Sequence, residues 1–401
     1  MRKILITSFL FFLIFAYGLV LSQIKVSVFE DELEPANHAG FYDYRGVTNV
    51  HTDRGIGSGS VNDVIRSAQA AQLDYLFITD LNVFSGPPVP EGYHRQLLVM
   101  TGTEYSYLES RLLTYDRLRR HSVDSLGQAQ VLLADLLSQS GPDAEPDLII
   151  LAHPAKPGFS WTGPYPSGID GIEVLNLKSI WQQAWNSSKI SFLWSAIIYP
   201  FIPQLALLRL YDEPEEELNL WDQLSLKGKT VGMAGAEATA KTGGMDRFSV
   251  HFPSYQTSFS LLSNHVLLRS ELTGHAESDR GKILRSLEDG QFYMCLDLLG
   301  NPKGFAAYIQ DGEKIIPMGA RAKWNPGMKL IVHIPRKPEV PFETAFLKDG
   351  QHIMSSNSED TEYELHSKGV YRVIVRVFPT LTLLDGQRWL TWIYSNPFYL
   401  D

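Results

Sequence analysis

Five short segments place polar side chains directly after apolar runs that have the pattern of β-strands. The segments are 49–53 (NVHTD), 79–81 (TDL), 102–104 (GTE), 152–154 (AHP) and 235–239 (GAEAT). Parallel strands that are connected by helices end at the same edge of their sheet. We therefore expect the polar side chains of these segments to gather in one place, although they are far apart in the chain.

Strand and helix patterns alternate from about residue 44 to residue 300. Apolar runs predict strands over 47–51, 75–79, 97–100, 147–152, 171–175 and 230–233. Apolar residues at helical spacing predict helices over 61–71, 126–137, 218–226 and 282–287. Ser60 and Asp63 have the spacing of a capping box at the start of the first of these helices. This alternation predicts an α/β barrel of parallel strands, with its site at the carboxyl ends of the strands.

The pattern changes after about residue 303, where helical periodicity ends. Short strand patterns follow, separated by turns such as Asp311-Gly312 and Asp349-Gly350; they span 306–309, 329–334, 342–346, 371–377 and 389–394. About 100 residues of this kind are typical of an antiparallel β-sandwich. Because 401 residues are too many for one small core, we expect two domains, 40–302 and 303–401.

Composition excludes some classes of function. The chain is 44% hydrophobic and 20% charged, which is ordinary for a globular protein, and its net charge is −10. Since so acidic a chain repels phosphate backbones, we expect no nucleic-acid partner. The single cysteine, Cys295, allows no internal disulfide, and its apolar surroundings in the sequence predict a buried, unreactive thiol.

The N-terminus has the pattern of an export segment. Arg2 and Lys3 precede an apolar run over 4–21, and small residues offer a cleavage site before Gln23. We expect 1–22 to be a signal peptide or an N-terminal membrane anchor, with a cleaved signal favoured. Either one predicts a protein that is periplasmic or extracellular, or anchored on the outer face of the cytoplasmic membrane.

The segment 190–217 fits neither half of the chain. Its first part, 190–210, is strongly apolar, and its last residues, 212–217, are mostly acidic. Pro200 and Pro203 would interrupt a single membrane-spanning helix. We expect a helical insertion that packs on the barrel; the alternative is an apolar patch that docks on a bilayer.

Taken in order, the five polar segments resemble the metal-binding motifs of the polymerase and histidinol phosphatase (PHP) superfamily. The resemblance covers about residues 44–300, and the stretches 220–222 and 395–399 also resemble this lineage. It implies a PHP-type distorted (βα)7 TIM-like barrel, followed by an all-β Ig-like sandwich. It further implies a site in which up to three divalent metals polarise a phosphoester and activate water.

The resemblance implies that one of the three metal sites is retained in part. Its ligands would be Asn49, His51, Glu104 and Glu237. Asn49 stands where the family has histidine, and Glu237 stands where it has aspartate. Since an asparagine side chain can bind a cation through its carbonyl oxygen, four ligands of acceptable type remain for Mn, Fe or Zn.

The other two metal sites depart further from the family pattern. The second would share Glu104 and His153 with Arg111, which stands where the family has histidine and whose fixed charge repels a metal. The third would need ligands at Leu81 and Thr239, which cannot supply the family's imidazoles. The resemblance therefore implies one divalent metal, with His153 as a further candidate ligand, or none.

Arg111 has two alternative roles. It forms an internal ion pair with Glu104 or Glu237, or it joins His153 and Lys156 to hold a small anion, because a guanidinium group grips phosphate or carboxylate with two bonds. Asp53 and Asp80 are expected to cap loops or orient their neighbours rather than to catalyse.

Three hypotheses of function follow. The first is a degenerate metal-dependent phosphoesterase that has lost trinuclear catalysis and binds a small anionic ligand, a phosphoester or a partner. The second is an active single-metal phosphoesterase that uses Asn49, His51, Glu104 and Glu237, with Glu104, His153 and Arg111 as the catalytic candidates. The third is a cell-envelope scaffold or binding protein. We also expect an association with the membrane as a further partner.

Overall fold

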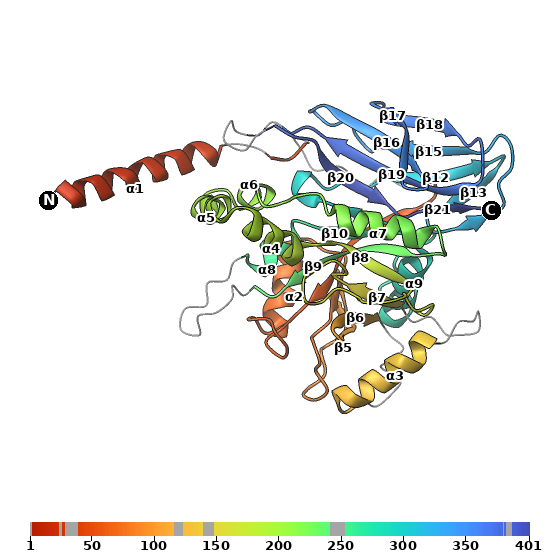
Figure 1. Ribbon diagram of the computed structural model, residues 1–401, viewed down its shortest axis with the longest axis horizontal. Helices are drawn as coiled ribbons and strands as arrows, with labels where there is room; N and C mark the ends of the chain where they lie inside the picture. Colours follow the sequence, from red (N-terminus) through yellow and green to blue (C-terminus); the bar gives the residue numbers. More distant parts are fainter. Residues whose placement is uncertain are drawn as a thin grey trace.

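The computed structural model describes residues 2–23, 26–28, 39–115, 123–138, 148–240, 253–379, 381 and 387–401. Figure 1 shows a mixed α/β body, with one long N-terminal helix projecting from it and the C-terminal strands gathered at one end.

A large sheet forms the centre of the N-terminal part, and each expected strand of this part is present. Its principal strands are β1 (Tyr42–Val50), β2 (Tyr75–Ile78), β4 (Leu97–Thr101), β7 (Leu148–Ala152), β8 (Gly171–Asn176) and β9 (Val231–Ala238). β1 lies parallel to both β2 and β9, β2 lies parallel to β4, and β8 lies parallel to β7 and β9. The expected parallel pairing of these strands is confirmed.

The sheet is mixed, however, because some strands were not expected. They are β3 (Gly92–His94), β5 (Thr103–Tyr107), β6 (Ser110–Tyr115) and β10 (Ser263–Leu268), whereas β11 (Phe292–Cys295) coincides with the apolar, strand-like run around Cys295. β5 and β6 form an antiparallel hairpin, β6 runs antiparallel to β7, and β10 runs antiparallel to β1 and β11. The hairpin turns at Leu108, whose φ of 52° lies in the left-handed region. The expectation of a wholly parallel sheet was therefore wrong.

Helices accompany the large sheet. They are α2 (Val61–Ala70), α3 (Leu126–Ser138), α4 (Leu177–Ser187), α7 (Glu215–Ser225), α8 (Tyr255–Phe259) and α9 (Ala276–Asp289). The predicted capping box is confirmed: the Ser60 hydroxyl accepts from the Asp63 amide, and the Asp63 carboxylate accepts from the Ser60 amide. α2 then buries Val64, Ile65 and Ala68 on one face, as its amphipathic spacing predicts.

The C-terminal part consists of β-strands, as predicted. β12 (Ala306–Asp311), β13 (Lys314–Pro317), β15 (Lys329–His333) and β18 (Asp360–Glu364) form a four-stranded antiparallel sheet. The remaining strands are β14 (Arg321–Ala322), β16 (Phe342–Lys348), β17 (Gln351–Ser356), β19 (Gly369–Val377), β20 (Leu390–Ser395) and β21 (Phe398–Leu400). β20 pairs with both β19 and β11, so these strands continue the large sheet.

The N-terminal helix α1 (Arg2–Leu21) is long and apolar enough to cross a membrane, judged by length and composition; its span Lys3–Leu21 has a mean hydropathy of 2.6. The insertion forms two short helices, α5 (Lys189–Ile198) and α6 (Pro203–Leu208), so its predicted helical character is confirmed. Pro203 begins α6, where its missing amide hydrogen costs no hydrogen bond.

Candidate metal and anion site

The five expected polar segments meet at one site. Asn49 lies at the end of β1, His51 follows it, Glu104 lies in β5, His153 follows β7, and Glu237 lies near the end of β9. All five side chains are buried. His51 Nε2 lies 3.3 Å from Glu104 Oε2, His153 Nε2 lies 3.8 Å from Glu104 Oε1, and His153 Nδ1 lies 3.5 Å from Glu237 Oε2. Strand ends thus bring together residues that are almost two hundred positions apart.

The backbone is strained at three of these positions. Asn49, His153 and Glu237 have φ angles of 57°, 35° and 38°, in the left-handed region that residues other than glycine rarely adopt. Asparagine tolerates this conformation, whereas histidine and glutamate pay about 1 kcal/mol or more for it. Strain of this kind persists where the surrounding structure fixes the direction of a side chain, and it is concentrated at functional sites.

Several buried polar atoms of this site have no hydrogen-bond partner within the described residues. They are Asn49 Oδ1, both ring nitrogens of His51, Glu237 Oε2 and Arg111 Nη1. The 3.3 Å approach of His51 to Glu104 is within ion-pair distance, but it is not a hydrogen bond. Each unsatisfied buried group costs about 1–3 kcal/mol. Their convergence at one place is the property expected of a binding site.

The protonation states of His51 and Glu104 follow from burial. Burial lowers the pKa of His51 to about 3, so its imidazole is neutral and keeps a lone pair. Burial raises the pKa of Glu104 to about 7, against the opposing effect of His153. A neutral imidazole beside a carboxyl group and the free oxygen of Asn49 are ligands that suit a divalent cation. By ligand type, the predicted set of Asn49, His51, Glu104 and Glu237 therefore fits one metal.

The surroundings of Glu237 oppose a metal. Lys178 Nζ lies 3.0 Å from Glu237 Oε1, and Lys156 Nζ lies 3.4 Å from the same oxygen. Burial alone would raise the pKa of Glu237, but His153, Lys178 and Lys156 hold it well below its usual range. A metal bound through Oε2 would therefore lie near two ammonium groups that already neutralise this carboxylate.

Arg111 lies at the site, on β6. Its guanidinium carbon is 5.1 Å from the centroid of the Phe159 ring, and Lys156 Nζ is 5.1 Å from the same centroid. The expected ion pair of Arg111 with Glu104 or Glu237 does not form within the described part of the chain, where the two lysines contact Glu237 instead. Arg111 therefore keeps one buried donor nitrogen free for a ligand.

The sequence analysis missed Glu173, Asn176 and Lys178. Glu173 lies on β8 and is fully buried. Its Oε1 accepts from Asn49 Nδ2 at 2.8 Å, and its Oε2 accepts from Asn176 Nδ2 at 2.9 Å and from the His153 amide at 3.1 Å. It holds Asn49 so that the Oδ1 atom stays free. One signal was available: a glutamate inside the apolar run 171–175 is rare in a buried strand unless it has partners.

Gly235 makes room for this arrangement. A Cβ atom at this position would lie 1.7 Å from Glu173 Oε1, so no larger residue fits unless the carboxyl group moves. The glycine of segment 235–239 therefore allows the glutamate of β8 to cross over β9 and reach Asn49.

The remaining predicted residues lie around the site. Asp80 accepts from the amide and the hydroxyl of Thr52 at 2.5 and 2.6 Å, which is the orienting role expected for it. Leu81 forms a backbone bridge with Glu104, and the Thr239 carbonyl accepts from the Ser58 amide at 3.0 Å. Asp53 is exposed.

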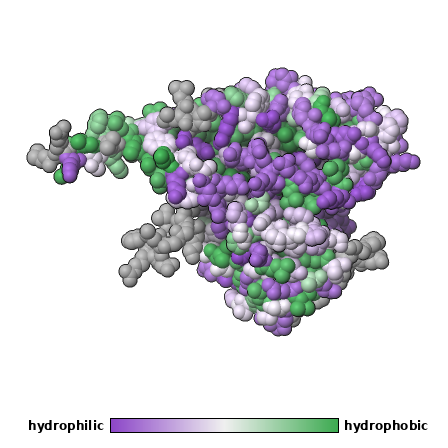
Figure 2. Space-filling view, in the orientation of Figure 1, coloured by the Kyte–Doolittle hydropathy of each residue, from purple (hydrophilic) through white to green (hydrophobic). Residues whose placement is uncertain are grey.

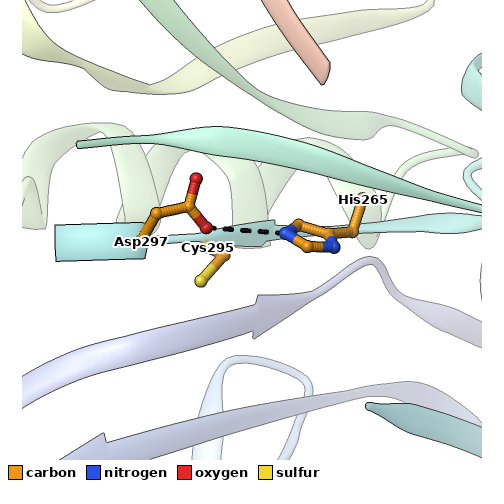
Figure 3. A group of neighbouring side chains, drawn as sticks. All are labelled: His265, Cys295 and Asp297. Carbon is orange, nitrogen blue, oxygen red and sulfur yellow. Dashed lines mark hydrogen bonds and ion pairs between the residues drawn. The ribbon is translucent and has the colours of Figure 1, made fainter. Parts of the chain in front are cut away.

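A second buried cluster contains the one group of three potential metal ligands that the described residues bring within 4.8 Å of one another: His265, Cys295 and Asp297 (Figure 3). Arg45 Nε also donates to Asp297 at 2.8 Å, and His265 Nδ1 lies 2.8 Å from Asp43 Oδ1. Two cations and two carboxylates therefore pair here. Burial alone would lower the pKa of His265, but Asp43 and Asp297 raise it to about 9, which leaves a protonated ring without a lone pair for a metal.

The cysteine of this cluster is fully buried, as predicted. Burial raises the pKa of the Cys295 thiol well above its usual value, and nearby Asp297 raises it further. The thiol is therefore neither a nucleophile nor a metal ligand near neutral pH. We interpret the cluster as a structural ion-pair network.

No protein-family model and no curated protein matches the sequence. A solved two-domain protein from Bacteroides vulgatus, described as containing a predicted PHP-like metal-dependent phosphoesterase, is 12% identical with a TM-score of 0.41; the alignment covers 90% of this chain and 98% of that one. A proposed metal-dependent phosphoesterase from Bifidobacterium adolescentis is also 12% identical, with a TM-score of 0.26 and coverage of 54% and 94%. Similarity at this level does not establish a shared fold or activity.

Proposed function

We propose that the N-terminal part, 40–302, is a PHP-like distorted (βα)7 barrel and that 303–401 is an Ig-like sandwich. The order of the five motifs supports this assignment. The pairings of β7, β8, β9, β1, β2 and β4 support it as well, because they place the carboxyl ends of these strands around the site. The protein would then be a degenerate member of the PHP superfamily.

Its function would be to bind a small anion, such as phosphate or a phosphomonoester, at a site where fixed cations have replaced most of the metal cluster. The observation that carries this proposal is the pair of lysines on Glu237, together with the unpaired Nη1 of Arg111. The lysines neutralise the carboxylate that a metal would need. Arg111 and Lys156 each lie 5.1 Å from the centroid of the Phe159 ring, so both cations are held beside the buried site.

Calorimetric titration with inorganic phosphate and phenyl phosphate tests this proposal. We expect saturable binding by chelator-treated protein, and a loss of at least tenfold in affinity for Arg111→Gln, which corresponds to about 1.4 kcal/mol. Arg66→Gln is the matched control, because Arg66 lies on the surface with an exposed side chain. Absence of binding, or equal affinity in the two variants, would contradict the proposal.

A second candidate function is single-metal phosphoester hydrolysis. It is favoured by the free atoms of Asn49, His51 and Glu237, which are the positions that the sequence assigned to one metal together with Glu104. A bound divalent cation would polarise a phosphoryl oxygen and activate water. Glu104 would hold the cation together with His51, and Arg111 would offset charge on the phosphoryl group.

Metal analysis separates the two functions. Protein purified without chelator would be examined by elemental mass spectrometry and screened against a phosphodiester and a phosphomonoester in added Mn²⁺. The first function predicts substoichiometric metal and no turnover. Stoichiometric metal, with turnover abolished by His51→Ala and Glu104→Gln, would replace it with the second.

A further inference from the structure

The part of the molecule next to α1 carries an exposed apolar surface. Ile190, Leu193 and Ile197 of α5 are 83, 55 and 42% exposed, and we call this set the apolar α5 face. Trp185, near the end of the neighbouring helix α4, is 39% exposed. Ile190, Leu193 and Ile197 have the spacing of one side of a helix, so α5 presents a continuous apolar stripe. A stripe of this kind on a surface helix is costly in water and marks a contact with an apolar partner.

α1 packs directly beside this face. The rings of Tyr17 and Trp194 are 5.8 Å apart, as are those of Phe15 and Phe201. A Cβ atom on Gly18 would lie 2.5 Å from the Phe201 ring, so only glycine allows the helix to approach this closely. Trp194 belongs to α5 and Phe201 follows it, so the contacts with α1 adjoin the exposed residues of the apolar α5 face.

The C-terminal end of α1 is also tied to the rest of the protein. Leu21 is 2% exposed and joins the main hydrophobic core. Val28 donates its amide to the Leu299 carbonyl at 2.7 Å, which fixes the chain a few residues further on. Most of the apolar side chains before this point are exposed, for example Ile4, Phe9 and Phe11. The helix is therefore anchored in the body at one end, and most of its described side chains are exposed (Figure 1).

We propose that α1 is retained as a membrane-spanning helix and that the apolar α5 face docks on the same bilayer. The occupant of this face is the lipid interface, because α1 is long and apolar enough to span and its last turns hold α5 where the helix meets the body. Lys189 Nζ lies 5.8 Å from the centroid of the Trp185 ring. A lysine and a tryptophan beside an apolar stripe are typical of a helix at the membrane surface.

The arrangement is visible on the surface. Figure 2 shows hydrophobic colour along α1 that continues onto the edge of the body where this helix ends. The proposal is independent of the function of the strand-end site, which is formed by other residues, at and after the ends of β1, β7 and β9.

The test uses the full chain in vesicles of phosphatidylethanolamine and phosphatidylglycerol. A spin label would be attached at Leu193→Cys, and in a second protein at Val131→Cys, since Val131 is an equally apolar, 73% exposed residue on the distant helix α3. Cys295 is fully buried and would not react with the label. We expect the label at position 193 to collide with oxygen but about tenfold less with a water-soluble nickel chelate than the label at position 131.

Three outcomes would overturn the proposal. Equal access of the chelate to the two labels would show that the apolar α5 face lies in water. Protection of position 193 from both reagents, in detergent as well as in vesicles, would identify a protein partner instead of lipid. A mature chain whose mass lacks residues 1–22 would exclude a retained helix.

Gly18→Leu supplies a matched variant that leaves the apolar α5 face unchanged. The larger side chain would push α1 away from Phe201 while the helix keeps its apolar length. We expect the protein to remain in the membrane and the label at position 193 to become accessible to the chelate. Unchanged protection would show that α1 does not position the face.

Discussion

The molecule contains two buried clusters of charged residues that differ in how fully their polar atoms are paired. In the network of Asp43, Arg45, His265 and Asp297, none of the side-chain nitrogen and oxygen atoms is left without a partner. Arg45 alone donates to Asp297 and to the carbonyls of Ala71 and Phe259. In the strand-end site, by contrast, free atoms remain on several side chains.

The difference indicates which cluster is structural and which one binds a ligand. A satisfied network joins elements firmly, because breaking any pair leaves a charge uncompensated in the interior. An unsatisfied cluster lowers stability, and its presence in a native fold is expected where a ligand, an ion or water completes it. His265, Cys295 and Asp297 are residue types that can bind a metal, but here they belong to a fully paired network. The strand-end site, whose polar atoms are only partly paired, has the properties of a binding site.

Breaking the satisfied network should reduce the free energy of unfolding more than any other change proposed here. Arg45→Ala would leave Asp297 buried with His265 as its remaining cation, and would also remove two hydrogen bonds to backbone carbonyls. We expect a loss of about 3–5 kcal/mol in the free energy of unfolding, measured by urea denaturation. Arg66→Ala, on the surface, should change it by less than about 0.5 kcal/mol. Similar values for the two variants would show that the network around Arg45 does not stabilise the fold.

The second effect is a dependence of stability on pH. The pKa of His265 is about 9 in the folded protein and about 6.5 in the unfolded chain. A group whose pKa is raised by folding contributes stability that is fully present below pH 6.5 and is lost as the pH rises through 9. We expect a loss on the order of 3 kcal/mol between these limits. Urea denaturation across this pH range measures the loss, and His265→Gln should flatten the pH dependence of the free energy of unfolding. If this variant keeps the full pH dependence, another group is its source.

A smaller effect is expected at Glu173, the residue that supports the strand-end site. Glu173→Leu would remove the acceptor of Asn49, Asn176 and the His153 amide, and leave these donors unpaired. Each unpaired donor costs about 1–3 kcal/mol, but replacing a buried carboxylate by an apolar side chain offsets part of this cost. We therefore expect a net loss of about 1–3 kcal/mol in unfolding free energy and a weaker affinity for phosphate, measured by denaturation and calorimetry. Full stability in this variant would mean that Glu173 does not organise the site.

The smallest change in the free energy of unfolding is expected at His51. Because neither ring nitrogen of His51 makes a hydrogen bond within the described residues, His51→Phe should change the free energy of unfolding by less than about 1 kcal/mol, or increase it. The same change at His265 should be strongly destabilising, since its ring contacts two carboxylates. Thermal denaturation of the two variants would decide; equal destabilisation would show that His51 is structural as well.

Local sequence patterns predicted much of the fold. The capping box at Ser60, the apolar strand cores and the strand-end positions of His51 and His153 depend on neighbouring residues, and all are present. The hairpin of β5 and β6 was missed because its strands carry polar side chains that weaken the apolar pattern. β9 extends beyond its expected end for a similar reason, since small residues such as Ala236 have little strand preference.

Local patterns in the chain are enough to identify the residues at the strand ends, because strand and turn signals are local. How these residues pair depends on the fold, since the pairing depends on distances between separate strands. The fold placed Lys156 and Lys178, rather than Arg111, on Glu237, and it placed Glu173 behind Asn49. The chemistry of the site follows from this pairing, because burial and neighbouring charges set which atoms are free to bind.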